Sequence, residues 1–276
     1  MVTPTQRRKA ATQLCEKGLT QRLSCRTVGI SRSTLLYQPR RMEAEKAFAE
    51  AVKAMSERYP RFGYRRIAVM LGWERNETVN PKRVYRFWKE LGLALPKRRP
   101  RRKRPGQTTP LPVAINANHT WSYDFVSDRC ANGQKLKILA VVDEHTRECL
   151  ALEVAGSIKS HHLINTLGRL MALYGKPKYL RSDNGPEFTA KAVLQWLTDN
   201  QIGPAFIKPG SPWQNAYVES FNGKFRDECL SREWFLNRQD AQRIIERWRK
   251  FYNHERPHSS LGNMTPAQAG NRDKVA

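Results

Sequence analysis

Acidic residues, cysteines and long apolar runs are all scarce in this chain of 276 residues. No apolar run approaches the ~20 residues that a transmembrane helix needs, and the N-terminus has no signal-peptide core. The five cysteines are scattered, and no pair has the spacing of a zinc knuckle. These absences argue against a membrane protein and against a zinc module, and they predict reduced, mostly buried thiols and a cytoplasmic location.

Positive charge, by contrast, is abundant and unevenly distributed. The chain holds 49 lysine and arginine residues against 25 acidic ones, for a net charge of +24. Residues 1–112 carry 27 of the basic residues and 8 of the acidic ones, so most of the surplus lies in the first half. Such a surplus suits a phosphate polymer but says nothing about the fold. We therefore predict that the first half binds nucleic acid and that the second half is an ordinary globular domain.

Residues 1–40 have the pattern of a helix-turn-helix unit. A helix over 21–28 is expected to end at Gly29, and Ser31 is a natural N-cap for a short helix over 32–37. The core of this unit is predicted to consist of four apolar residues, Val28, Ile30, Leu35 and Leu36. The residues expected to face a DNA groove are Arg32, Ser33 and Thr34. An ordinary helical hairpin with a basic surface is the alternative.

A helical linker over 41–58 is predicted to lead to a second helix-turn-helix-like unit over 59–96. Asn80 and Pro81 form an N-cap followed by proline at the first helical position. The apolar stripe of this helix consists of Val84, Phe87, Trp88 and Leu91. The other face carries Lys82, Arg83 and Arg86, which are predicted to contact DNA. A merely solvated basic face is the alternative.

The segment 97–114 is predicted to be a basic linker. Seven of the eight residues from 97 to 104 are basic, and they repel one another, so this run cannot fold alone. We expect it to follow a phosphate backbone through Lys97, Arg98, Arg99, Arg101, Arg102, Lys103 and Arg104. Prolines at 105, 110 and 112 mark the domain boundary.

Residues 115–276 have an alternating pattern of strands and helices. Strands are predicted over 121–126, 136–142, 149–154, 179–182 and 204–207, the first three as an antiparallel meander. Helices are expected over 161–174 and 190–197, from 218 onwards, and over 241–252 as the final helix. This order predicts an α/β fold with a mixed five-stranded sheet covered by helices.

Three acidic residues in this second half lie at positions that a folded sheet could bring close together. Asp124 falls in mid-strand, Asp183 falls just after a strand, and Glu219 lies near the start of a helix. Carboxylate oxygens are ligands for Mg²⁺, and two such ions can support phosphoryl transfer. Taken by themselves the residues leave the choice of acids open, because Asp143, Glu144 and Glu187 are rivals.

Four motifs in this half closely resemble those of the DDE-type insertion-sequence transposases, which are kin to retroviral integrases. The motifs are Trp121–Phe125, Arg181–Phe188, Ser211–Asn222 and Tyr252–Leu261. The resemblance covers about 115–270 and implies a ribonuclease-H-like fold with Asp124, Asp183 and Glu219 as the catalytic, metal-binding triad. It implies two Mg²⁺ ions, for which Mn²⁺ can substitute. The zinc module of retroviral integrases is absent.

The resemblance also implies the function. A second-reading-frame product of this family would bind the terminal inverted repeats of an insertion sequence and catalyse strand cleavage and transfer into target DNA. We expect a homo-oligomer on DNA, an upstream reading-frame product as a further partner, and a bacterial, nucleoid-associated location. Lys224 and Arg226 are expected to approach the DNA backbone, and supporting roles are expected for Asn184, Asn215 and Asn222. The alternatives are a DNA-binding regulator with an inactive catalytic domain and a host nuclease for branched DNA or RNA hybrids.

Overall fold

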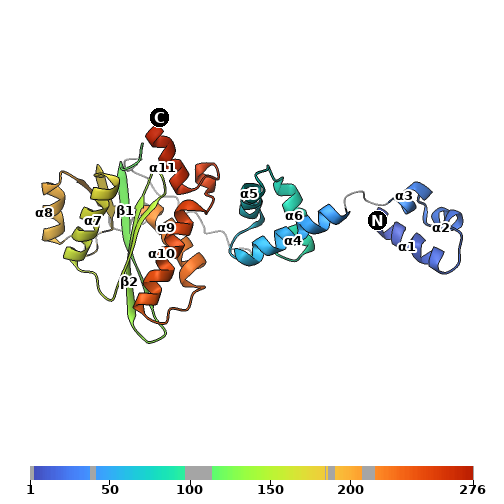
Figure 1. Cartoon of the computed structure of the whole chain (residues 1–276), viewed down its shortest axis with the longest axis horizontal. Coiled ribbons are helices and arrows are strands. Elements are labelled where there is room, and N and C mark those ends of the chain that lie inside the picture. Colours follow the sequence, from blue (N-terminus) through green and yellow to red (C-terminus); the bar gives the residue numbers. More distant parts are fainter. Residues whose placement is uncertain are drawn as a thin grey trace, which may run out of the picture. The chain divides into compact units, whose positions relative to one another are not determined.

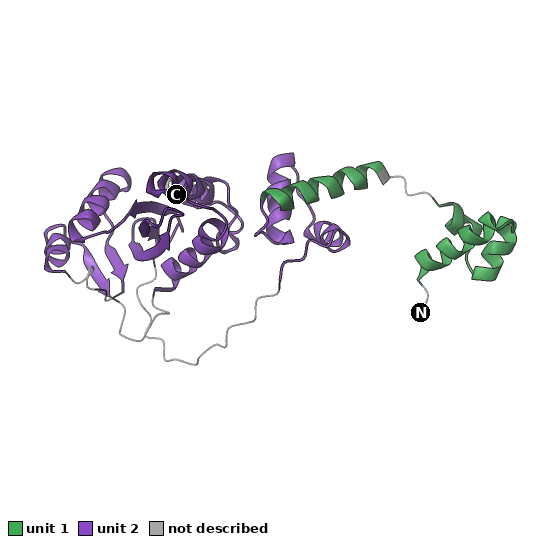
Figure 2. Ribbon diagram, turned by 90° about the horizontal axis from the view of Figure 1, so that it is seen from below, with its two compact units in different colours: residues 1–58 green, residues 59–276 purple. Residues whose placement is uncertain are grey.

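The computed structural model describes residues 3–37, 42–96, 114–183, 185, 190–206 and 215–275. The chain forms two compact units, residues 1–58 and residues 59–276 (Figure 2). The predicted DNA contacts at 97–104, together with Asn184 and Glu187, lie outside the described residues.

The described residues of the first unit form four helices, α1 (Pro4–Glu16), α2 (Gln21–Val28), α3 (Arg32–Leu36) and α4 (Met42–Arg58). The side chains of Thr20 and Ser31 accept hydrogen bonds from the backbone at the starts of α2 and α3, and Gly29 ends α2 in the left-handed conformation (φ 70°). One expectation is wrong: Leu36 is 57% exposed rather than packed. It is the last residue of a five-residue helix, which is too short to bury both of its leucines.

The second unit begins with α5 (Tyr64–Arg75) and α6 (Pro81–Glu90). Asn76 ends α5 with a φ of 51°, and the side chain of Asn80 caps α6. Val84, Phe87 and Trp88 are buried as expected, but Leu91 is 38% exposed. Leu91 is the C-cap of α6 (φ −87°, ψ 0°) and therefore leaves the buried face of the helix.

A mixed five-stranded sheet forms the centre of the second unit, which confirms the prediction. Its strands are β1 (Thr120–Arg129), β2 (Lys135–Asp143), β3 (Cys149–Ala155), β4 (Tyr179–Ser182) and β5 (Gly203–Phe206). Their order is β3-β2-β1-β4-β5. The strands β1, β2 and β3 pair antiparallel, whereas β4 pairs parallel with both β1 and β5.

Helices cover both faces of the sheet (Figure 1). On one face, α7 (Ser160–Tyr174) and α8 (Lys191–Asp199) pack on a core that includes Trp121 and Tyr123. On the other, α9 (Ala216–Phe225) and α10 (Arg238–His254) pack on a core that includes Val126. Because side chains alternate along a strand, the even-numbered residues of β1 face α9 and α10. Asp124 therefore points toward the helix that carries Glu219.

The C-terminal region is longer than expected. A π-helix, η2 (Arg226–Leu230), continues α9, and a 3₁₀ turn, η3 (Ser259–Leu261), follows α10. The prediction that 241–252 forms the final helix is wrong, because α11 (Pro266–Val275) follows it. Thr265 and Gln268 cap the start of α11 reciprocally, with hydrogen bonds of 2.9 and 3.2 Å. In the described part of the chain, no helix is long and apolar enough to span a membrane.

Candidate active site

The pairing of β1 with β4 brings two of the predicted acids to neighbouring positions. Ser122 lies opposite Arg181 in this parallel pair. Asp124 and Asp183 each follow two residues later, so strand alternation gives them the same face as Ser122 and Arg181. The carboxyl end of β4 therefore places Asp183 beside the middle of β1.

Asp124 is held in place by two hydrogen bonds. Its Oδ1 accepts from the amide of Phe125 at 2.7 Å, and its Oδ2 accepts from the Asn222 side chain on α9 at 2.8 Å. Burial, followed by the negative charges of Asp183 and Glu219, raises the pKa of Asp124 to about 6, although both hydrogen bonds oppose the shift. The three predicted acids are thus electrostatic neighbours, although they come from two strands and a helix.

Asp183 and Glu219 are less confined than Asp124. Asp183 Oδ1 accepts a hydrogen bond from the amide of Gly185 at 3.0 Å, and Glu219 lies exposed in the first turn of α9. Among the described residues, no three His, Cys, Asp or Glu side chains are close enough together to form a preformed metal cage. Three carboxylates repel one another, and Mg²⁺ retains several waters and binds substrate phosphate. An open carboxylate site therefore fits a hard divalent cation that the protein holds together with its substrate.

A buried ion pair lies directly behind this site. Arg181 Nη1 donates to Glu144 Oε2 at 2.9 Å, and the Ser122 hydroxyl donates to Glu144 Oε1. The side chains of Arg181 and Glu144 are 3% and 0% exposed. Burial raises the pKa of Glu144, while the Ser122 hydrogen bond and the Arg181 charge oppose the shift. This pair connects the end of β2 to β1 and β4 two residues before Asp124 and Asp183.

Asp143, the other described rival acid, also has structural partners. Its Oδ2 accepts from the amide of Asn118 at 2.7 Å, and its Oδ1 accepts from the amides of His145 and Thr146 at 2.8 and 2.9 Å. It therefore shapes the turn between β2 and β3. In the structure, Asp143 and Glu144 accept hydrogen bonds that stabilise the fold, whereas Asp183 and Glu219 have fewer such contacts.

The predicted DNA-contact residues in the helical regions lie at the surface. Arg32, Ser33 and Thr34 are exposed in α3, where the Ser31 hydroxyl lies 2.8 and 2.7 Å from the hydroxyls of Ser33 and Thr34. On α6 the exposed face opposite the buried stripe carries Lys82, Arg83 and Arg86. Their contact with DNA stays a prediction.

The two DNA contacts predicted on α9 and η2 have different surroundings. Arg226 is exposed, whereas Lys224 is half-buried and donates to the Ser220 hydroxyl at 2.8 Å and to the Ser220 carbonyl at 3.2 Å. Burial and the nearby charge of Arg256 lower the pKa of Lys224 to about 8. Of the predicted supporting residues, Asn222 contacts Asp124, and Asn215 is buried at the start of α9.

Sequence reasoning did not identify the ion pairs that brace this site. Glu144 was considered only as a rival acid, and Glu228 was not singled out. In the structure Glu228 accepts two hydrogen bonds from Arg256, at 2.7 and 2.6 Å. Local sequence carries no signal for such pairs, because 28 positions separate Glu228 from Arg256 and 37 separate Glu144 from Arg181.

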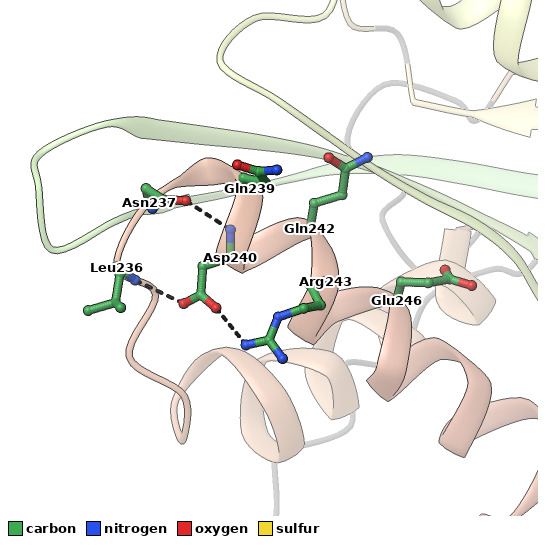
Figure 3. A pocket seen from close by; sticks show the side chains of 7 residues that line it. All are labelled: Leu236, Asn237, Gln239, Asp240, Gln242, Arg243 and Glu246. Atoms are coloured by element: carbon green, nitrogen blue, oxygen red, sulfur yellow. Dashed lines mark hydrogen bonds and ion pairs between the residues drawn. The ribbon is translucent and has the colours of Figure 1, made fainter.

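A separate pocket at the start of α10 does not involve these acids (Figure 3). Its polar groups pair with one another. Asp240 accepts hydrogen bonds from Arg243 at 2.9 Å and from the amide of Leu236 at 3.2 Å, and its own amide donates to the Asn237 side chain at 2.9 Å. The Arg243 hydrogen bond lowers the pKa of Asp240. These contacts cap a helix, so we do not assign the pocket a chemical role.

The sequence matches three family profiles. Two are described as Integrase core domain and cover residues 115–212 and 200–266, and one is described as HTH-like domain and covers residues 43–102. With the mixed sheet described above, the first two matches establish a ribonuclease-H-like core.

Similar proteins come from bacterial insertion elements. The chain is 40% identical over 251 residues to the 31.7 kDa protein of insertion element IS407 from Burkholderia multivorans, with 91% of this chain and 90% of that protein covered. It is 39% identical over 268 residues to the 39.2 kDa protein of IS476 from Xanthomonas euvesicatoria, with 97% and 77% covered. The candidate transposase InsK of IS150 from Escherichia coli is 27% identical over 262 residues, with 90% and 92% covered.

Among solved structures, the HTLV-2 integrase catalytic core domain in complex with magnesium is similar at 18% identity and a TM-score of 0.44. The similarity covers 56% of this chain and 98% of that domain.

Proposed function

This chain belongs to the DDE-type transposases of insertion elements, which are polynucleotidyl transferases with an integrase core, and we propose that it cleaves the ends of its element and joins them to target DNA. We propose Asp124, Asp183 and Glu219 as its catalytic, metal-binding residues. The observation that carries this assignment is geometric: the parallel register of β1 and β4 puts Asp124 and Asp183 on one face, and Asn222, on the helix that carries Glu219, donates to Asp124 at 2.8 Å. Like charges gathered in this way require a cation, and the protein is otherwise strongly basic.

The proposed metal is Mg²⁺, with Mn²⁺ as a substitute and two ions in the active complex. Carboxylate oxygens are its preferred protein ligands, and the solved HTLV-2 integrase core was obtained with magnesium. When bound, the ions supply activation of the attacking hydroxyl and stabilisation of the leaving oxygen. Asn222 orients Asp124 through the 2.8 Å hydrogen bond, and the pair of Arg181 with Glu144 fixes the strands that carry Asp124 and Asp183.

The proposed chemistry consists of two displacements at phosphorus. In the first, a water oxygen attacks a phosphodiester at the element's end, and the broken P–O bond leaves a free 3′ hydroxyl. In the second, that 3′ hydroxyl attacks a phosphodiester of the target, so one P–O bond forms as another breaks. The bond count is conserved, and the reaction therefore needs neither ATP nor a covalent enzyme intermediate.

The proposed DNA partners are the terminal inverted repeats and the target. The exposed basic residues of α3 and α6, with the exposed Arg226 at the start of η2, suit contacts to the phosphate backbone. Joining two ends implies that several copies assemble on DNA, and the product of an upstream reading frame is proposed as a further partner. The place of action would be the bacterial nucleoid.

The test uses the full chain and a labelled duplex with the element's end. We expect wild-type protein to nick and join this duplex in Mg²⁺, and Asp183→Asn and Glu219→Gln to lose both activities while still binding the duplex. Full activity of either variant would refute the triad. Binding without cleavage by wild-type protein would favour a regulator with an inactive catalytic domain, whereas structure-selective cutting without joining would favour a host nuclease.

A further inference from the structure

The segment Tyr59–Arg66, which we call the docking segment, lies against the C-terminal part of the core. It precedes and begins α5, in the region matched by the HTH-like profile. The rings of Tyr59 and Phe62 stack on each other and on Phe251 of α10, with centroid distances of 5.4, 5.5 and 6.1 Å. Phe62 is only 2% exposed. An aromatic side chain of the helix-turn-helix-like region is therefore buried in a contact with the catalytic domain.

Two ion pairs accompany this aromatic contact. Arg61 pairs with Asp227, and Arg66 Nη1 lies 3.4 Å from Glu228 Oε1. Glu228 also receives the guanidinium of Arg256 as a two-pronged hydrogen bond. Both guanidinium groups lie over the Phe62 ring, Arg66 at 5.0 Å and Arg256 at 5.6 Å from its centre. Glu228 is thus the point at which the docking segment and the C-terminal tail motif meet.

Glu228 lies on the continuation of the catalytic helix. It belongs to η2, which follows α9 without interruption, and α9 carries Glu219 and Asn222. Glu219 and Glu228 therefore lie on one continuous helical segment. The docking segment consequently contacts the same helical segment that presents a proposed metal ligand.

The Glu228 carboxylate is the negative charge among several positively charged side chains. Arg66, Arg256 and Lys224 surround it. Burial and the charge of Arg256 lower the pKa of both Arg66 and Lys224, and the negative charge of Glu228 opposes this shift. The side chain of Glu228 is 7% exposed and that of Arg256 is 1% exposed. Removing one partner of such a buried group leaves uncompensated charge. The docked arrangement therefore depends on Glu228 more than on an exposed pair such as Arg61 with Asp227.

We propose that Glu228 is a positioning residue that couples the docking segment to the catalytic helix, so that Glu219 is set for reaction when the helix-turn-helix-like region is docked. This inference rests on the proposed function. It makes catalysis conditional on DNA that α5 and α6 hold, and thereby contributes to specificity for the element's end. Loss of this coupling is expected to lower the rate of cleavage at saturating DNA and to leave DNA affinity unchanged.

The test compares Arg66→Glu with Arg65→Glu in the full chain. Both substitutions make the same charge change at adjacent positions of α5, but Arg65 is exposed and donates to the Tyr64 hydroxyl, whereas Arg66 faces Glu228. We expect Arg66→Glu to lower kcat for end cleavage about tenfold or more, because small misplacements near a reacting site cost up to about 10²-fold. Both variants are expected to bind end DNA equally well, and Arg65→Glu is expected to keep the wild-type kcat.

Hydrogen exchange supplies a readout that does not depend on activity. We expect peptides covering 59–66 and 225–231 to exchange faster in Arg66→Glu than in Arg65→Glu. Equal kcat and equal exchange in the two variants would overturn the proposal. If Arg66→Glu does not fold, Glu228→Gln takes its place, and an unchanged kcat in that variant would overturn it. A wild-type protein that neither cleaves nor joins would instead refute the proposed function, while the exchange data would still decide whether the segment docks.

Discussion

At the scale of single residues, the proposed site depends on polar contacts that hold an acid in place. Asp124 has both carboxylate oxygens occupied, one by a backbone amide and one by Asn222. The Asn222 side chain is 8% exposed and comes from the helix that carries Glu219. Such outer partners of metal ligands set ligand orientation, and their loss typically costs about 10–100-fold in metal affinity or activity.

Asn222→Ala is therefore expected to weaken Mg²⁺ binding by about tenfold, because Asp124 loses a donor that orients it. Calorimetric titration of the full chain with Mg²⁺ measures this. Asn237→Ala is the control, since Asn237 caps α10 through a 2.9 Å hydrogen bond to the Asp240 amide and does not contact the acids. The control is expected to lose about 1 kcal/mol of stability without a change in Mg²⁺ affinity. Equal affinities in both variants would contradict the role given to Asn222.

His258 provides a pH prediction. Burial, followed by the charges of Arg256, Lys224 and Arg66, lowers its pKa from 6.5 to about 3. Between these values the unfolded chain binds a proton that the folded chain does not, so this residue destabilises the fold as the pH falls below about 6.5. We expect the free energy of unfolding of the wild type to fall more steeply from pH 7 to pH 5 than that of His258→Gln. Urea titrations at several pH values measure the two slopes, and identical slopes would show that His258 does not titrate in this way.

At the scale of elements, the pairing of β1 with β4 decides which side chains meet. The parallel register spans only Thr120 to Ser122 on β1. The buried pair of Glu144 with Arg181 adds a contact across β2, β1 and β4 at the point where this short register ends. The elements thus align the acids, and the ion pair secures the alignment.

Glu144→Gln is expected to destabilise the fold strongly, by about 3–5 kcal/mol, because it leaves the buried Arg181 charge without its carboxylate. Glu153→Gln is the matched control. Glu153 pairs with Arg169 at the surface, where the side chains are 35% and 57% exposed, so its loss is expected to cost about 0–1 kcal/mol. Urea unfolding of both variants checks the difference, and equal losses would mean that the buried pair contributes little.

At the scale of the whole molecule, the surplus of positive charge and the proposed catalytic acids lie in different halves of the chain. The basic surplus lies mainly in residues 1–112, whereas the proposed catalytic acids lie in residues 113–276, where 22 basic residues face 17 acidic ones. Phosphate contacts release counterions, and affinity then falls with salt in proportion to the number of contacts. The protein can therefore hold DNA with one part while it presents acids with another.

Replacing Lys82, Arg83 or Arg86 by glutamine is expected to reduce the slope of log affinity against log salt by about 0.9 for each residue. Fluorescence anisotropy with end DNA at several salt concentrations measures the slope. Arg243→Gln is the control, because Arg243 lies on α10 of the integrase core domain, outside the helix-turn-helix-like region, and pairs with Asp240. A slope that changes equally in all four variants would place the phosphate contacts elsewhere.

Local sequence alone determined the elements and much of their order. Caps such as Ser31 and the pair Asn80 and Pro81, a two-residue alternation in strands and an apolar helical stripe act within a few residues, so they can be read directly. The predicted five-stranded sheet is confirmed, as are the boundaries of α2 and β4. The exceptions, Leu36, Leu91 and α11, lie at helix ends or in weakly apolar sequence, where these signals fade.

Only the tertiary structure showed which contacts each acid makes. The residues alone leave Asp143, Glu144 and Glu187 as rivals, and the family resemblance favours Asp124, Asp183 and Glu219. Their partners lie far along the chain: Glu144 meets Ser122 across 22 positions and Arg181 across 37, and Asn222 meets Asp124 across 98. The contact of Arg66 with Glu228 spans 162 positions. Burial and charge at such distances depend on packing, so no local pattern could separate the acids that stabilise the fold from those that remain open for chemistry.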